Sequence, residues 1–179
     1  KSLNIGLDGQ FASWAGTLVP IGTPIAVVAE NEAQIEEAAM RLARVGHETV
    51  SGSMLIDNYT GETKAVEQVS VEEVSELTKT EKFLQFVDVR RPAEHAAGHA
   101  VRTINIPLDK LSSDFEKLDP TAPTFVICQG GYRSAIAASL LGRLRPGPIV
   151  NVIGGTAEWI SAGNPVETSA SAPAGAGGA

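Results

Sequence analysis

The sequence of 179 residues contains one cysteine and no long apolar run. A single cysteine excludes an intramolecular disulfide and suits a reducing compartment, so we expect a cytoplasmic location. No stretch approaches the roughly 18 apolar residues that a membrane span requires, and no signal peptide is visible. We therefore expect no membrane partner.

Positive charge is also scarce. The chain contains 14 Lys and Arg residues against 21 Asp and Glu residues, which gives a net charge of −7 and a pI near 5.0. Nucleic acids bind basic surfaces, so this balance argues against a nucleic-acid partner. Hydrophobic residues make up 43% of the chain, which is enough for packed cores, and the length predicts one or two domains.

The only cysteine opens a six-residue loop between two predicted elements. The apolar run Thr124–Ile127 predicts a short buried strand, and the Ala/Leu-rich segment 134–143 predicts a helix. A thiol at such a turn faces the positive end of the helix dipole and free backbone N–H groups, which favour the thiolate. The loop consists of Cys128, Gln129, Gly130, Gly131, Tyr132 and Arg133, and Ser134 follows it.

The composition of this loop predicts a nucleophilic cysteine. A lone cysteine after an apolar strand is often an inert core residue. Gly130 and Gly131, however, let the backbone curl around a sulfur-sized anion, and Arg133 adds a positive charge and a fork of donors for an anionic substrate. Tyr132 is compatible with a role in shaping access to the sulfur, and equally with that of a surface aromatic.

A second motif lies upstream, where an apolar strand ends in Asp88 and Arg90. Pro92 can start the following helix and Gly98 can end it. The order of motifs is Asp-x-Arg, helix, Gly-His, Ile-Asn-Ile-Pro, Cys-x-x-Gly-x-Arg-Ser, and then Gly-Gly near a Trp. Over roughly residues 69–166 this order resembles the rhodanese (sulfurtransferase) family.

The resemblance implies an α/β fold with a central parallel sheet flanked by helices, and the activity of a sulfurtransferase. It implies that Cys128 carries sulfur as a persulfide, with small sulfur anions and thiols such as thiosulfate, sulfite and glutathione persulfide as partners. It assigns catalysis to Cys128 and Arg133, substrate and persulfide binding to Gln129, Gly130, Gly131, Tyr132 and Ser134, and support to Asp88 and Arg90. An ordinary ion pair at a strand end is an equally good description of that support.

Two other functions compete with sulfur transfer. Related cysteine phosphatases carry one more loop residue because a phosphoryl group needs a wider cradle, whereas four residues separate Cys128 from Arg133. A non-catalytic scaffold or binding module is the second alternative, since disarmed rhodanese folds often serve as one. A metal at His95 and His99 is disfavoured because Gly-His belongs to the family's helix end, so we expect no metal or cofactor in this chain.

The chain also resembles itself at a separation near 100 residues, which predicts a duplicated domain. The aligned segments are 3–5 with 104–106, 25–29 with 124–128, 38–45 with 137–144, and 50–52 with 152–154. In the first copy Ala29 stands in place of Cys128, and the cradle has no glycine and no arginine. Glu30 and Glu32 there would repel an anion.

We therefore expect an inactive partial repeat at residues 1–55, a linker at 56–68, an active domain at 69–167 and a flexible tail at 168–179. Because the first copy begins in mid-domain, we expect the chain to be part of something longer. Segment 3–16 resembles the part that follows the metallo-β-lactamase-fold domain in bacterial persulfide dioxygenase–rhodanese fusions. This resemblance implies a non-haem iron in a further N-terminal domain. A homo-oligomer is compatible with the sequence.

Overall fold

The computed structural model describes residues 2–81 and 83–169. It divides into an N-terminal unit of residues 4–65 and a C-terminal unit that runs from Val66 onward, and each is described by itself. In the described part of the chain, no helix is long and apolar enough to cross a membrane. Most of the predicted tail at 168–179 lies outside the described residues.

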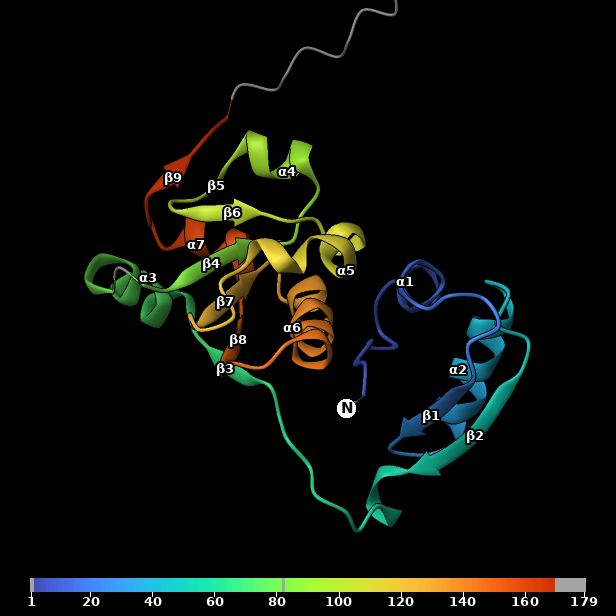
Figure 1. Cartoon of the computed structure of the whole chain (residues 1–179). Helices are drawn as coiled ribbons and strands as arrows, with labels where there is room; N and C mark the ends of the chain where they lie inside the picture. The colour runs from blue at the N-terminus through green and yellow to red at the C-terminus, as the bar shows by residue number, and fades with distance from the viewer. Residues whose placement is uncertain (1, 82, 170–179) are drawn as a thin grey trace, which may run out of the picture. The chain divides into compact units, whose positions relative to one another are not determined.

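The C-terminal unit is built on a parallel sheet whose strand order, within the described residues, is β3-β8-β7-β4-β6 (Figure 1). Its strands are β3 (Glu67–Val69), β4 (Gln85–Asp88), β6 (Thr103–Asn105), β7 (Thr124–Ile127) and β8 (Ile149–Val152). Every residue of the central strand β7 is buried, as its continuous apolar sequence predicts for a strand covered on both faces. The predicted α/β fold with a central parallel sheet is confirmed.

Helices cover both faces of this sheet. The covering helices are α3 (Val71–Thr80), α6 (Tyr132–Leu144) and α7 (Gly155–Ser161). The unit also contains α4 (Pro92–Ala97), α5 (Leu111–Asp114) and the 3-10 turns η2 (Leu108–Lys110) and η3 (Phe115–Lys117). Alternate residues of a strand point to opposite faces. On one face Phe125 and Ile127 pack with Val74 of α3 and Trp159 of α7. On the other face α6 packs against β7 and β8 (Figure 1).

The predicted helix between Pro92 and Gly98 is confirmed, because α4 begins at Pro92 and Gly98 is its C-cap residue. A short antiparallel pair, β5 (His99–Ala100) with β9 (Val166–Glu167), follows it. Strand β3 begins at Glu67, two residues before the predicted start of the domain at residue 69. Residues 67 and 68, assigned to the linker, therefore pair with β8.

The N-terminal unit contains one βαβ crossover among its described residues. Its elements are α1 (Phe11–Leu18), β1 (Ile25–Ala29), α2 (Glu32–Ala43), β2 (Val50–Leu55) and the 3-10 turn η1 (Ile56–Asn58). Strands β1 and β2 pair in parallel, and α1 packs against α2. Phe11, Ala38 and Leu42 form the core with Val27, whereas Val28 on the alternate position is 49% exposed.

Strand pairing corrects one part of the internal alignment. Ile25 lies opposite Val50 and Thr124 lies opposite Ile149. With 25–29 aligned on 124–128, Val50 matches Ile149. Gly52, which lies opposite Ala26 after a register shift in the first pair of strands, matches Val150 opposite Phe125. The predicted match of 50–52 with 152–154 is therefore wrong by three residues at Val50 and by four at Gly52. Gly52 lies within β2, whereas Gly154 lies beyond the end of β8. Residues 3–5 form no strand, since β4, the partner of β6, has no counterpart among the described residues of the N-terminal unit.

Candidate active site

The cysteine loop lies at the carboxyl edge of the parallel sheet. Strand β7 ends at Ile127, α6 begins at Tyr132, and Cys128 between them is 1% exposed. The predicted strand, loop and helix are all present in that order. Strand β4 ends at Asp88 beside β7, so its polar end lies at the same edge.

The sulfur receives a hydrogen bond from the loop itself. The backbone N–H of Gly131 donates to Cys128 Sγ over 3.1 Å. Gly131 is the N-cap of α6 with φ 103°, in the region that favours glycine. The hydroxyl of Ser134 donates to the carbonyl oxygen of Gly131 at 3.0 Å. Of the two loop glycines, only Gly131 has a positive φ, and a Cβ on Gly130 would meet no described atom within 4 Å.

The two predicted supporting residues form a buried ion pair that reaches the loop. Arg90 donates from Nε and Nη2 to the Asp88 carboxylate at 2.7–3.1 Å, and both residues are almost fully buried. Arg90 also donates to the Gly98 carbonyl at 2.8 Å and to Gln129 Oε1 at 3.3 Å. A buried pair is tolerated when its donors and acceptors are satisfied in this way. It links the end of β4 to the first residue after the cysteine.

Arg133 is held by a residue that sequence reasoning missed. Its two terminal nitrogens donate to the two carboxylate oxygens of Glu94 in α4, at 2.8 and 2.7 Å. These bonds from Arg133 lower the pKa of Glu94 to about 2, against the opposing effect of burial. The hydrogen bond to Glu94 likewise raises the pKa of Arg133. The guanidinium group of Arg133, predicted to bind an anionic substrate, is therefore already bound to the carboxylate of Glu94.

The other predicted loop residues differ in exposure, and the two histidines near the site lie side by side. Tyr132 is partly buried on the first turn of α6, and Gln129 and Gly130 are exposed. His95 and His99 lie in different elements with stacked rings 3.5 Å apart. Burial, and then His99, lower the pKa of His95. Among the described residues, no group of three or more His, Cys, Asp or Glu side chains is arranged to hold a metal ion.

The equivalent turn of the N-terminal unit has ordinary helix-capping chemistry. The Asn31 side chain accepts the N–H of Gln34 at 3.0 Å, and Gln34 Oε1 accepts the N–H of Glu30 at 3.0 Å. Ala29 carries no reactive group. This turn is capped by its own side chains.

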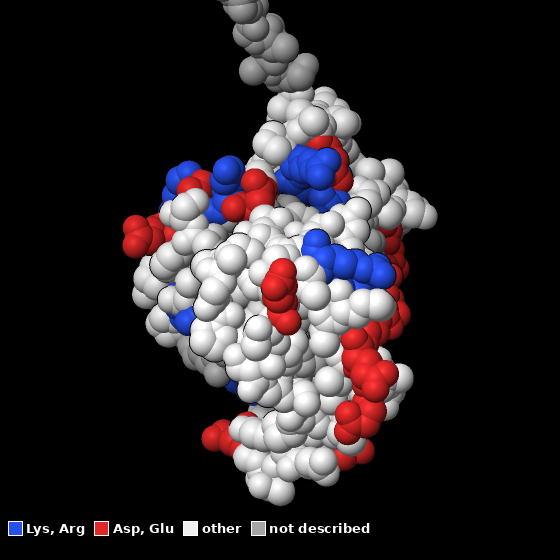
Figure 2. Space-filling model, turned by 90° about the vertical axis from the view of Figure 1, so that its right-hand side faces the viewer, with Lys and Arg blue, Asp and Glu red and all other residues white. Residues whose placement is uncertain are grey.

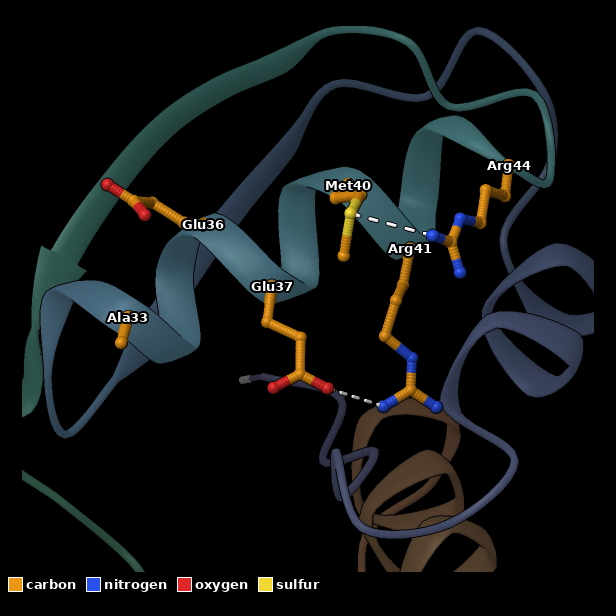
Figure 3. A pocket seen from close by; sticks show the side chains of 6 residues that line it. All are labelled: Ala33, Glu36, Glu37, Met40, Arg41 and Arg44. Carbon is orange, nitrogen blue, oxygen red and sulfur yellow. Dashed lines mark hydrogen bonds and ion pairs between the residues drawn. The ribbon is translucent and has the colours of Figure 1, made fainter.

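The outer face of α2 carries a shallow pocket, shown in Figure 3, in which Glu37 pairs with Arg41 at 2.9 Å. Arg41 also donates to the carbonyl oxygens of Leu7 and Gly9 at 2.6 and 2.9 Å, so it ties the segment before α1 to α2. Figure 2 shows both acidic and basic side chains at the surface of the face in view. Arg41 in this pocket thus has structural partners.

The C-terminal unit is thus an α/β domain with a buried thiol in a strand-to-helix loop, at the carboxyl edge of its parallel sheet. Residues 70–162, just over half of the 179-residue chain, match the family described as Rhodanese-like domain. The chain belongs to this rhodanese-like family.

Several relatives of the chain are named sulfurtransferases. Thiosulfate sulfurtransferase 18 of Arabidopsis thaliana is 31% identical over 128 residues, which cover 62% of this chain and 92% of that protein. A sulfurtransferase of Allochromatium vinosum is 28% identical over 102 residues, 56% of this chain and 94% of that one. In contrast, the chain spans only 51% of the length of YrkF and 60% of YqhL, both from Bacillus subtilis, at 24% and 35% identity.

A solved structure supports the same fold. The rhodanese-related protein of Thermoplasma volcanium is 34% identical, with a TM-score of 0.52. The match covers 56% of this chain and 97% of that chain.

Proposed function

We propose that the C-terminal unit is a sulfurtransferase that carries a sulfane sulfur as a persulfide on Cys128. The observation that carries the proposal is the buried thiol whose Sγ accepts the Gly131 N–H, in a loop sized for sulfur. Relatives named sulfurtransferases support it. A Cys-based phosphatase is less well supported, because the loop is one residue too short for a phosphoryl group.

In the first half-reaction, the Cys128 thiolate attacks the sulfane sulfur of thiosulfate or glutathione persulfide. The S–S bond of the donor breaks as the S–S bond to Cys128 forms, and sulfite or the thiolate of glutathione leaves with the electron pair. Loop N–H groups, beginning with that of Gly131, stabilise the anionic sulfur. Arg133 contributes its positive charge nearby, while its fork remains bonded to Glu94.

In the second half-reaction, a thiophilic acceptor attacks the outer sulfur of the persulfide. Cyanide, sulfite or a thiol can serve, and Cys128 leaves as the thiolate, ready for the next donor. No side-chain general base is required in either half-reaction, since the attacking species in each is an anion.

The N-terminal unit fits a supporting role in the same scheme. We propose that it is a partial, cysteine-less copy of the rhodanese fold, and that the chain is the rhodanese part of a persulfide dioxygenase fusion in sulfide oxidation. Sulfite produced by the dioxygenase would then be the acceptor, and thiosulfate the product. The iron of that reaction would belong to another domain, since the described residues offer no metal cluster.

Intact mass spectrometry tests the proposal. Incubation with excess thiosulfate should add one sulfur, about 32 Da, to the Cys128 peptide, and cyanide should remove it. Cys128→Ser is the control, and it should gain no mass while keeping its fold. If the wild-type thiol reacts with a small alkylating reagent but never gains sulfur, the chain is a binding module or a phosphatase-like protein instead.

A further inference from the structure

The first turn of α7 contacts the backbone of the cysteine loop directly. The N–H of Thr156 donates to the carbonyl oxygen of Cys128 at 2.8 Å, and the N–H of Ala157 donates to that of Gln129 at 3.1 Å. These N–H groups belong to the first helical turn, where no intrahelical acceptor is available. The loop therefore supplies the acceptors that this end of α7 lacks.

These two bonds set the direction of two peptide groups. A peptide unit is planar and trans, so its C=O and the following N–H point in opposite directions. Because the carbonyls of Cys128 and Gln129 point at α7, the N–H groups of Gln129 and Gly130 point away from it. They are the neighbours in sequence of the Gly131 N–H, which donates to the sulfur.

The contact depends on the absence of a side chain at Gly155. A Cβ there would lie 2.4 Å from the Cys128 carbonyl oxygen and 2.7 Å from the Gln129 carbonyl carbon and oxygen. All three of these atoms belong to the backbone, which cannot rotate away as a flexible side chain can. Gly155 also has φ +65°, a conformation that other residues rarely adopt.

Helix α7 is itself fixed in the core. Trp159 is fully buried, its ring lies 5.7 Å from that of Phe86, and its Nε1 donates to the Pro165 carbonyl at 2.7 Å. Thr156 is fully buried as well. The turn that meets the loop is thus backed by packed side chains and offers the loop a rigid surface.

We infer that Gly155 is a positioning residue for the sulfur-transfer site. It allows the first turn of α7 to approach the loop and bind the carbonyls of Cys128 and Gln129. These bonds turn the N–H groups of Gln129 and Gly130 away from α7 and toward the anionic sulfur. The inference rests on the proposed function for its catalytic consequence, although the effect on the thiol alone can be measured without any sulfur donor.

The experiment compares Gly155→Ala with Gly163→Ala. Gly163 also has a positive φ, +73°, but a Cβ there meets no described atom within 4 Å, so it controls for backbone strain alone. Gly155→Ala should slow sulfur uptake from thiosulfate by about 10- to 100-fold, while Gly163→Ala stays near the wild-type rate. The pH midpoint of Cys128 alkylation by iodoacetamide should rise only in Gly155→Ala. Circular dichroism checks that both variants are folded.

A second variant keeps the test decisive if Gly155→Ala does not fold. Ala157→Pro removes the N–H that bonds Gln129, at an exposed position of the first turn, where proline is compatible with a helix. It should slow uptake about 3- to 10-fold. A folded variant with an unchanged rate and alkylation midpoint overturns the inference. If the wild type takes up no sulfur, the proposed function fails, and the alkylation profiles alone decide the role of Gly155.

Discussion

Two crossovers of this chain, β1–α2–β2 and β7–α6–β8, both join a pair of parallel strands through one helix, and they differ at the turn before that helix. Each begins with a pair 25 residues apart, Ile25 with Val50 and Thr124 with Ile149 (50 − 25 and 149 − 124). At the N-cap of α2, the Asn31 side chain accepts a backbone N–H. At the N-cap of α6, Gly131 donates to the cysteine sulfur instead. The same kind of βαβ crossover therefore places either a side-chain cap or a hydrogen-bonded thiol at its turn, depending on a few residues.

The surroundings of the two turns differ as much as the turns themselves. In the C-terminal unit, Arg90 from the β4 end, Glu94 from α4 and the first turn of α7 all bond to residues 128–133. The described part of the N-terminal unit has no counterparts of β4, α4 or α7. The proposed reactivity of Cys128 would thus depend on both the turn and the elements that hold it.

The largest expected effect comes from moving the thiol between the two turns. In a Cys128→Ser background, Ala29→Cys should take up sulfur from thiosulfate at least about 100-fold more slowly than the wild type. The reason is that Glu30 and Glu32 repel an anion and no glycine N–H faces the sulfur. The measurement is mass gain over time, with alkylation as a check that the new thiol is accessible. Uptake near the wild-type rate would mean that the surroundings are unimportant.

The two tryptophans allow a matched comparison of the two cores. Trp159→Phe should lower the free energy of unfolding of its unit by about 2 kcal/mol, because it removes buried volume and the bond to Pro165. Trp14→Phe should cost less than about 1 kcal/mol, since the buried Nε1 of Trp14 has no hydrogen-bond partner among the described residues. Hydrogen exchange resolved by peptide reports on each unit separately. Equal losses would contradict this difference.

A smaller expected effect than that of Trp159→Phe concerns Glu94, which has no counterpart in the N-terminal unit. Its pKa is lowered from 4.5 to about 2 in the folded protein, so its contribution is present above pH 4.5 and is lost as the pH falls through 2. Glu94→Gln should cost about 1 kcal/mol at neutral pH, after allowance for solvent screening. It should also flatten the loss of stability between pH 4.5 and 2.

Denaturant unfolding at several pH values measures this effect. Glu36→Gln, at an exposed position of α2, controls for the loss of one carboxylate. A pH dependence of Glu94→Gln that matches the wild type would show that the ion pair with Arg133 contributes nothing to stability.

Local pattern predicted the strand, the loop and the helix around Cys128, because apolar runs, paired glycines and an Ala/Leu-rich segment act over short distances. It could not predict that Glu94 binds the guanidinium group of Arg133, since the two residues lie 39 positions apart, in α4 and α6, and meet only in the folded domain. The bonds from α7 to the loop carbonyls were missed for a related reason, as backbone N–H groups leave no mark on the sequence. The match of Val50 with Val152 failed because local pattern does not fix the register of a short strand.

The burial of Cys128 has a consequence for what an acceptor encounters. The residue is 1% exposed, while the outer sulfur of a persulfide extends about 2.05 Å beyond Sγ. If the S–S bond of the proposed intermediate points out of the loop, the transferred atom lies farther out than the sulfur that the protein keeps. An incoming nucleophile would then meet the transferred sulfur first, and the recessed Sγ of Cys128 would be shielded from attack. The depth of the thiol would in this way select which of the two sulfurs is attacked, so that Cys128 is released as the thiolate.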